Sequence, residues 1–203
     1  MNFHRFRQQL FSQGVFSTLD ISKLWPDFNP VNLVNWQDKG YVIKLRNKWY
    51  AFPDALTSEH HLFFIANRMH SPSYVSLEAA LRYYNFIPEI VFSITSVTTS
   101  KPMEWRTPVG HFMYRTLKPR LYFGYQLSDT QPQFLIASPE KVLIDMLYLN
   151  PYLSEPGAIE ELRLNAQQVQ HMVDVMRLQE YIGYIGSPAL TRRLEILHKI
   201  IFI

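Results

Sequence analysis

The first forty residues carry short apolar stripes at helical spacing, separated by polar and turn-forming residues. Phe3, Phe6 and Leu10 lie three and four positions apart, which predicts a short amphipathic helix. A Ser-x-x-Asp capping pattern and then Pro26 delimit a second helix over about 18–25. The pattern therefore predicts that the chain begins with two short helices.

The third helix has the clearest boundaries in the sequence. Asn29 offers a capping oxygen, and Pro30 suits the first helical position because its missing N–H would have no partner there. We expect the helix over 30–39. It should stop at Gly40, because glycine readily adopts the left-handed conformation that ends many helices.

Two β-prone runs follow the third helix. They occupy 41–45 and 49–52, on either side of a polar turn at 46–48. Such runs around a short polar turn are typical of a β-hairpin. Three short helices followed by a hairpin is the order of a winged helix-turn-helix. We therefore assign residues 1–54 to a winged helix-turn-helix DNA-binding domain.

Residues 60–203 predict a second domain of mixed type that ends in helices. Helices are expected over 60–69, 77–84 and 139–150, and strands over 90–97, 109–116, 121–126 and 134–137. Two further helices are expected in the tail, one capped by Asn165 with an apolar face that reaches Met176, and one that begins at Pro188. The expected fold class is α+β, mixed to about residue 150 and helical over 151–203.

Composition narrows the class of protein. With 47% hydrophobic and 18% charged residues the chain should bury a real core, and its net charge of +3 permits nucleic-acid binding without requiring it. No apolar run approaches the roughly 18 residues that a bilayer span needs, and the first residues lack the apolar stretch of a signal peptide. Cysteine is absent, which excludes disulfides and thiolate chemistry. These features predict a cytoplasmic protein without a membrane partner.

The third helix is expected to expose a polar stripe. Asn32, Asn35 and Lys39 follow one another at i, i+3 and i+7, on a stripe separate from Leu33 and Trp36. In a helix-turn-helix this stripe enters the major groove, where asparagine pairs with adenine and lysine contacts phosphate or guanine. A solvated helix face has the same appearance, so the stripe alone does not decide between the two interpretations.

The predicted hairpin strengthens the DNA-binding interpretation. Three basic side chains surround its turn, where they would suit the DNA backbone or the minor groove. The start of the third helix adds free backbone N–H groups that favour a phosphate. The candidate contacts to double-stranded operator DNA are Asn29, Asn32, Asn35, Lys39, Lys44, Arg46 and Lys48.

Enzyme signatures are weak in this chain. The seven histidines are scattered, the seven glycines form no phosphate-binding loop, and no Gly-x-Ser-x-Gly motif occurs. Glu140, Lys141 and Asp145 could suggest a metal nuclease, but the first two are better explained as the chemistry of a helix start. We therefore expect no enzymatic activity, no cofactor and no metal.

Four segments of the middle region share an ordered set of motifs. They are IANRMHSPSYVSLEAALRYYNFIPE (65–89), SITSVTTSK (93–101), TPVGHFMYRTLKPRLYFGY (107–125) and IASPEKVLIDMLYL (136–149). In this combination they resemble the AbiEi-type antitoxin and transcriptional-regulator family. With the N-terminal helices and the helical tail, the resemblance covers nearly the whole chain.

The resemblance implies a winged helix for operator DNA followed by an AbiEi-like C-terminal antitoxin domain over 60–203. Such proteins repress their own operon and oppose a nucleotidyltransferase-like toxin, in type IV toxin–antitoxin systems linked to phage defence and abortive infection. The antitoxin opposes the effect of the toxin without necessarily forming a stable complex with it. Some members of the family are regulators with no established toxin.

Two other classes of function stay open at this point. The chain could be a protein-interaction module whose middle region binds a toxin or another protein directly, since winged helices also serve as protein-binding modules. A hydrolase or nuclease is the third class, and it would require metal-dependent activity. Arg68, Arg115, Lys118 and Arg120 are basic candidates for a functional surface in the second domain.

Overall fold

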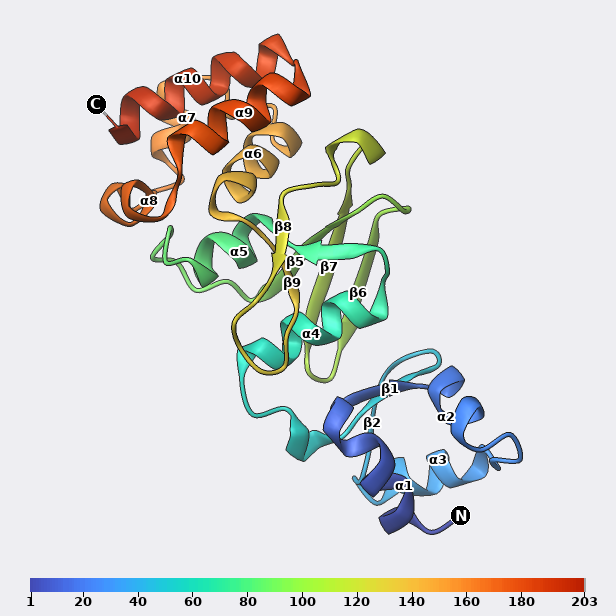
Figure 1. Cartoon of the computed structure of the whole chain (residues 1–203). Helices are drawn as coiled ribbons and strands as arrows, with labels where there is room; N and C mark the ends of the chain where they lie inside the picture. Colours follow the sequence, from blue (N-terminus) through green and yellow to red (C-terminus); the bar gives the residue numbers. More distant parts are fainter. Residues whose placement is uncertain (203) are drawn as a thin grey trace.

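A computed structural model describes residues 1–202 of the chain. The protein is a mixed α+β structure, as the pattern predicted. Its two ends lie far apart in Figure 1. The N-terminal helices occupy one end of the elongated molecule, the larger sheet lies in the middle, and the C-terminal helices occupy the other end.

The N-terminal portion combines three helices with a small sheet. Its elements are α1 (Phe3–Leu10), η1 (Phe11–Gln13), β1 (Val15–Ser17), α2 (Thr18–Leu24), α3 (Val31–Asp38), β2 (Ile43–Arg46), β3 (Trp49–Ala51) and η2 (Pro53–Ala55). The strands form an antiparallel sheet in the order β1-β3-β2. The three helices and the hairpin therefore follow the predicted order, and β1 is an addition that the hydrophobic pattern did not indicate.

Aromatic side chains fill the core between these helices and the small sheet. Phe6 from α1 lies 4.6 Å from Trp36 of α3 between ring centroids, and 5.3 Å from Phe16 of β1. Leu33 and Phe52 complete the cluster from α3 and from the residue after β3. Burying this many large rings is the main stabilisation available to a portion with so few residues.

The central sheet has six strands in the order β6-β7-β5-β4-β9-β8. The pairs β5–β7 and β4–β9 are parallel, and the other neighbours are antiparallel. The strands are β4 (Ser73–Val75), β5 (Ser93–Thr98), β6 (Met103–Thr107), β7 (Gly110–Thr116), β8 (Tyr125–Leu127) and β9 (Leu135–Ala137). The helical elements before and between them are α4 (Glu59–Met69), α5 (Leu77–Tyr83) and η3 (Pro119–Leu121).

The C-terminal helices pack around α6, which is the most deeply buried helix. They are α6 (Pro139–Leu149), α7 (Pro156–Glu160), α8 (Ala166–Met172), α9 (Val175–Ile185) and α10 (Pro188–Phe202). Ser138 caps α6 by accepting a hydrogen bond from the Lys141 amide, and Pro139 occupies the first helical position as expected. The α9–α10 turn closes at Gly186, whose φ of +61° is the left-handed conformation that favours glycine.

Three sequence-based expectations for this region were wrong in detail. The helix expected to run from Asn165 through Met176 is two helices, because the Asp174 carboxylate caps the amides of Met176 and Arg177 and starts α9 afresh. The strand expected over 121–126 is replaced by η3 and the short β8, and the edge strand β6 was not expected at all.

The small sheet is covered on both faces. Phe16 and Tyr50 face the N-terminal helices, whereas Val15, Leu45 and Ala51 belong to the larger core that continues into the central sheet. The N-terminal portion is therefore packed against the rest of the protein rather than tethered by a loop alone. Within residues 1–202, the structure contains no helix with the length and apolar character of a membrane span.

Candidate nucleic-acid interface

The start of α3 is fixed by the cap that the sequence predicted. The Asn29 side-chain Oδ1 accepts a hydrogen bond of 3.0 Å from the Val31 amide. This satisfies one of the free N–H groups at the helix start and commits the Asn29 oxygen to the helix itself. The positive end of the helix dipole remains beside it and favours an anion.

The exposed face of α3 differs from the predicted stripe. Leu33 and Trp36 are buried as expected, so the helical repeat turns Val31, Val34, Asn35 and Asp38 outward. Asn32 lies at the flank and is half-buried, because it stands next to the buried side of the helix. Lys39 is exposed but follows the helix as its C-cap.

Val31 and Val34 are the surface residues that sequence reasoning missed. Their relative exposures are 58% and 54%, and neither belongs to the N-terminal or the central core. Their positions relative to Leu33 and Trp36 on the helical repeat were the signal in the sequence that could have indicated them.

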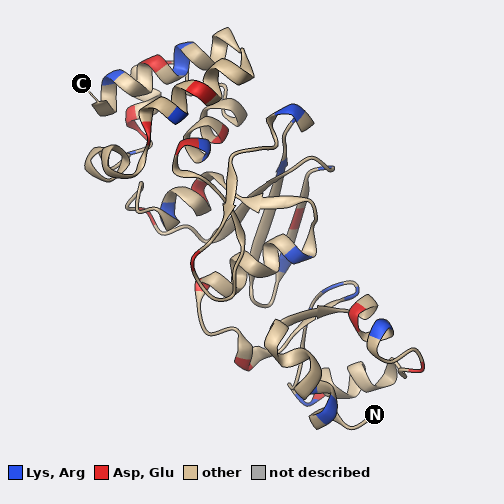
Figure 2. Ribbon diagram, in the orientation of Figure 1, with Lys and Arg blue, Asp and Glu red and all other residues tan. Residues whose placement is uncertain are grey.

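The turn of the hairpin presents Lys48 in an unusual backbone conformation. Lys48 is exposed and has a φ of +68°, in the left-handed region that a residue with a Cβ adopts at a cost of roughly 1 kcal/mol or more. Its carbonyl accepts a hydrogen bond of 2.9 Å from the Thr18 amide, which holds the turn against the start of α2. Figure 2 shows the basic colour on this turn and on α2 beside it.

Arg46, which was also predicted to contact DNA, lies on the other side of the hairpin from Lys44. The pairing of β2 with β3 slips by one residue between Lys44 and Arg46, so that Leu45 is an extra residue in β2. A bulge of this kind reverses the alternation of side chains along the strand. Lys44 stays exposed next to Tyr50, and Arg46 turns toward the central sheet.

The guanidinium of Arg46 is held by the second portion of the chain. Its Nη2 donates to the Met69 carbonyl oxygen at 2.6 Å, and its Cζ lies 4.1 Å from the centre of the Trp105 ring. Burial lowers the pKa of Arg46. This side chain therefore joins two parts of the protein.

Asp20 anchors the start of α2 and also pairs with the second portion. Its Oδ2 accepts from the Ser17 amide at 2.8 Å and the Ser17 hydroxyl at 2.7 Å, and it lies 3.4 Å from Nη2 of Arg68. Partial burial alone would raise the pKa of Asp20. The hydrogen bonds from Ser17 and the charges of Arg68 and Lys23 outweigh burial, so the pKa is lowered.

Two of the three residues weighed above as a metal-nuclease motif, Lys141 and Asp145, form a buried internal contact. The Lys141 ammonium pairs with the Asp145 carboxylate, and both side chains are fully buried. Tyr74 and Ser76 each donate to Asp145 Oδ2 at 2.9 Å. Glu140 points elsewhere and accepts from the Asp174 amide at 3.0 Å. Within residues 1–202 no three His, Asp or Glu side chains are grouped as metal ligands.

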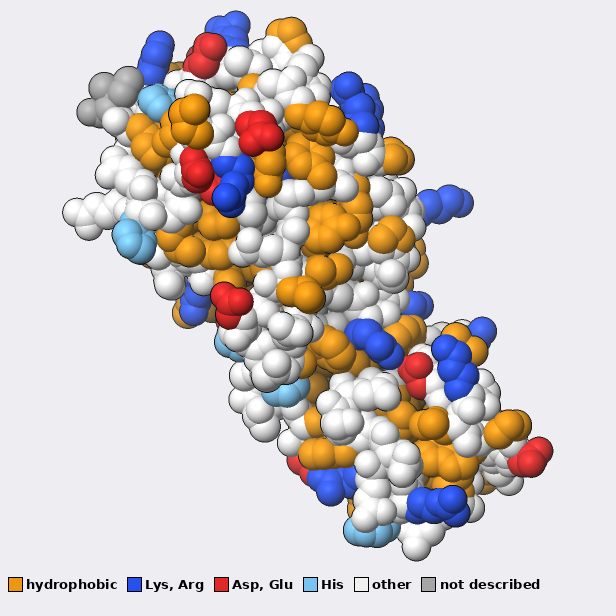
Figure 3. Space-filling view, viewed as in Figure 1, with side chains coloured by type: hydrophobic (Ala, Val, Ile, Leu, Met, Phe, Trp, Pro, Cys, Tyr) orange, Lys and Arg blue, Asp and Glu red, His pale blue; other side chains and the backbone are white. Residues whose placement is uncertain are grey.

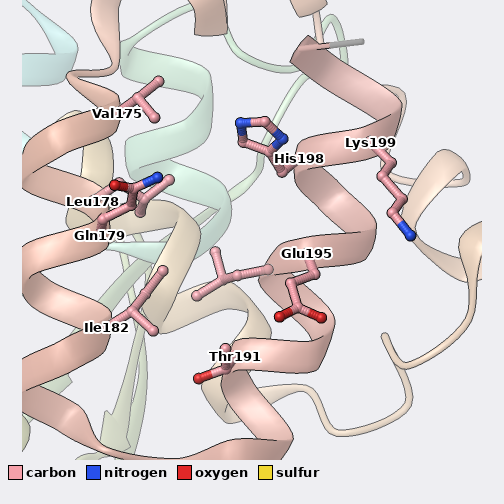
Figure 4. A pocket seen from close by; sticks show the side chains of 9 residues that line it. Val175, Leu178, Gln179, Ile182, Thr191, Glu195, His198 and Lys199 are labelled. Atoms are coloured by element: carbon pink, nitrogen blue, oxygen red, sulfur yellow. The ribbon is translucent and has the colours of Figure 1, made fainter.

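An apolar groove between α9 and α10 is the other notable surface feature. Its volume is about 380 Å³, and Figure 4 shows Leu178 and Ile182 of α9 facing Thr191, Glu195 and His198 of α10 across it. Hydrophobic side chains also reach the surface over these helices in Figure 3, between charged ones. The groove lies at the end of the molecule opposite to α3 (Figure 1).

Two of the four basic residues named as candidates in the second portion form hydrogen bonds or an ion pair within the protein. Arg115 donates to the Leu149 carbonyl and to Asn150, where it closes the end of α6. Arg68 pairs with Asp20. Lys118 and Arg120 remain exposed.

No protein-family model matches the chain, and no curated protein matches it.

Proposed function

We propose that this protein is a DNA-binding transcriptional regulator whose N-terminal portion is a winged helix-turn-helix. The order helix, strand, helix, helix, strand, strand and the sheet order β1-β3-β2 support this proposal. In this arrangement α3 is the recognition helix and the β2–β3 hairpin is the wing. The proposal extends the predicted module by one strand, β1, which fastens the wing to the helices.

The observation that carries the proposal is the set of groups exposed along α3 and the hairpin. Asn35 is an exposed amide on the outward face of α3, and Lys39, Lys44 and Lys48 are exposed along the chain that follows it. A lysine kept in a strained turn suggests that its side chain is needed there. We therefore assign base contact to α3 and phosphate contact to the three lysines.

Binding of the full chain to its own upstream DNA, measured by fluorescence anisotropy over a range of salt concentrations, tests this function. Phosphate contacts release counterions, so the affinity should fall steeply with salt. Replacing Lys44 and Lys48 by alanine should reduce the slope of log K against log salt by roughly 0.9 for each lysine. The matched control is the pair Lys118→Ala and Arg120→Ala, which removes the same charge from the second portion and should leave the slope unchanged. Equal slopes for the two double variants would contradict the assignment.

The biological role that we propose rests on the resemblance to AbiEi-type proteins. It is repression of the protein's own operon and antagonism of a nucleotidyltransferase-like toxin in a phage-defence system. The gene next to this one tests the role most directly. A nucleotidyltransferase gene whose product arrests growth, with arrest relieved by co-expression of this chain, is the expected result. Growth arrest that this chain does not relieve would remove the antitoxin role and leave the regulator.

The α9–α10 groove favours a second candidate function, direct binding of a protein partner by the C-terminal helices. Grooves lined by apolar residues with a charged rim accommodate amphipathic helices. If the toxin binds there, Ile182→Glu should abolish co-purification with it, whereas Glu180→Gln, on the same helix but outside the groove lining, should not. Antitoxicity that survives Ile182→Glu would favour action without contact.

A further inference from the structure

The outward face of α3 carries two valines that the fold does not use. Val31 and Val34 are 58% and 54% exposed and lie one helical turn apart. Neither belongs to a hydrophobic core. Valine is a poor choice for a solvated helix position, because its branched side chain loses rotamer freedom in a helix. Their methyl groups are therefore available to a binding partner of α3.

Asn35 lies in the same patch and has its amide free. It follows Val34 directly and stands four residues after Val31, so the three side chains form one surface. The Asn35 side chain makes no hydrogen bond within residues 1–202, whereas the Asn29 oxygen caps the helix. The outward face of α3 thus presents one side-chain amide without a hydrogen bond and two apolar side chains beside it.

This combination matches one base pair in the major groove. Adenine presents N7 as acceptor and N6 as donor, which an amide contacts with two hydrogen bonds, and thymine presents a 5-methyl group that accepts apolar contact. A G·C pair offers neither the methyl group nor the adenine pattern. We propose that α3 reads A·T pairs, with Asn35 on adenine and Val31 and Val34 on the methyl groups of neighbouring thymines.

Charge decides which part of α3 enters the groove. Asp38 is exposed at the last helical position, at the negative end of the helix dipole, and offsets the charge of Lys39 beside it, so this end attracts DNA less than the start of the helix does. The half of α3 that contains Val31 and Asn35 has no acidic residue and begins at the positive end. The lysines that follow α3 and those of the hairpin favour a polyanion over an apolar protein surface as its partner.

This inference rests on the proposed DNA-binding function, and thymine methyl removal separates the two. Duplexes that bind the full chain are selected from a random-sequence library and remade with deoxyuridine at single thymine positions. Loss of a contacted methyl should weaken binding roughly fourfold, as expected for one buried methyl-sized group. The selected sequences should contain A·T pairs at the positions that respond.

Variants of α3 complete a double-mutant cycle. The Val34→Ala variant should have the same affinity for duplexes with thymine and with uracil at the contacted position, whereas the wild type should bind the thymine duplex more tightly. Leu19→Ala is the matched control, since Leu19 is another exposed apolar residue of the N-terminal portion, at 61%, and should keep the thymine preference. Asn35→Ala should relax the choice of base at the adenine position alone.

Each outcome bears on one proposal or on both. Sequence-selective binding that is insensitive to every uracil replacement overturns the assignment of the valines and leaves the regulator intact. Absence of binding to any duplex, at low salt and with the whole library, overturns both proposals and assigns the valine patch to a protein partner.

Discussion

At the scale of single residues, Lys48 shows a conflict between stability and surface charge. Its φ of +68° costs free energy that a glycine would not require. We expect Lys48→Gly to raise the free energy of unfolding by about 0.5–1 kcal/mol and at the same time to weaken DNA binding at all sequences.

Urea unfolding and salt-dependent anisotropy measure the two effects of Lys48→Gly. The control is Asn47→Gly, at the neighbouring position of the turn, which adds chain freedom without removing a left-handed residue. It should be neutral or destabilising. Destabilisation by Lys48→Gly itself would show that its side chain holds the turn.

Asp20 gives a second prediction at the residue scale, with a defined pH dependence. Its pKa is lowered in the folded protein, so it stabilises the fold above its ordinary pKa of about 4 and loses this contribution as the pH falls through the folded value. Asp20→Ala should cost about 1–2 kcal/mol at pH 7, because the cap of α2 and the Arg68 pair are lost together.

Unfolding curves at pH 7 and at about pH 3 test the Asp20 prediction. The difference between wild type and Asp20→Ala should shrink at the lower pH, because protonation of Asp20 in the unfolded chain removes part of the stabilisation that its lowered pKa gives the folded protein. Asp27→Ala is the control, since Asp27 is exposed and takes part in no ion pair or side-chain hydrogen bond within residues 1–202. If the difference in the free energy of unfolding between wild type and Asp20→Ala does not change with pH, the charge of the carboxylate does not contribute to stability.

At the scale of elements, the pair Lys141–Asp145 joins α6 to β4 through Tyr74. A buried charge without its partner is costly, so Lys141→Met or Asp145→Leu alone should destabilise the protein by about 3–5 kcal/mol. The double variant Lys141→Met with Asp145→Leu leaves no uncompensated charge and should cost less than the sum of the single changes.

Thermal and urea unfolding of the three variants measure this coupling. The same variants also test whether the Lys141–Asp145 pair belongs to a nuclease site. A structural pair predicts loss of stability together with retained DNA binding in the double variant. Metal-dependent cleavage of DNA by wild type that disappears in a folded double variant would instead restore the catalytic interpretation.

Some features of the fold could be predicted from the sequence, and others could not. The cap at Asn29 and the start of α6 at Ser138 were predicted because local chemistry determines them. The bulge at Leu45 was not predictable, because it depends on how β2 fits against both β3 and the central sheet. A one-residue slip reversed the direction of Arg46, and the candidate site lost that residue.

The candidate site was predicted only in part for the same reason. Residue type indicated Lys44 and Lys48, which are exposed, but the pattern did not separate Asn32 at the flank from Asn35 on the outward face. That distinction follows from which side of α3 is buried. The N-terminal aromatic core determines it, through contacts such as that between Phe6 of α1 and Trp36 of α3, which lie far apart in the sequence.

At the scale of the whole molecule, the joint between the two portions yields the last prediction. Arg46, Trp105 and His70 lie together there, with His70 packed 5.6 Å from the Trp105 ring and its Nε2 3.2 Å from the Lys101 carbonyl oxygen. Arg46→Ala removes the contacts to Met69 and Trp105. It should lower the free energy of unfolding by about 1–3 kcal/mol, because a half-buried charged hydrogen bond is lost.

The same Arg46→Ala variant separates the structural role from a DNA contact. If Arg46 only joins the two portions, the salt dependence of DNA binding stays as steep as in wild type, whereas Lys48→Ala makes it shallower. Trp105→Leu is the partner control, since it removes the ring from the other side of the joint without changing any charge. It should reproduce the loss of stability seen for Arg46→Ala and leave the salt slope unchanged. A shallower slope for Arg46→Ala alone would return Arg46 to the DNA surface.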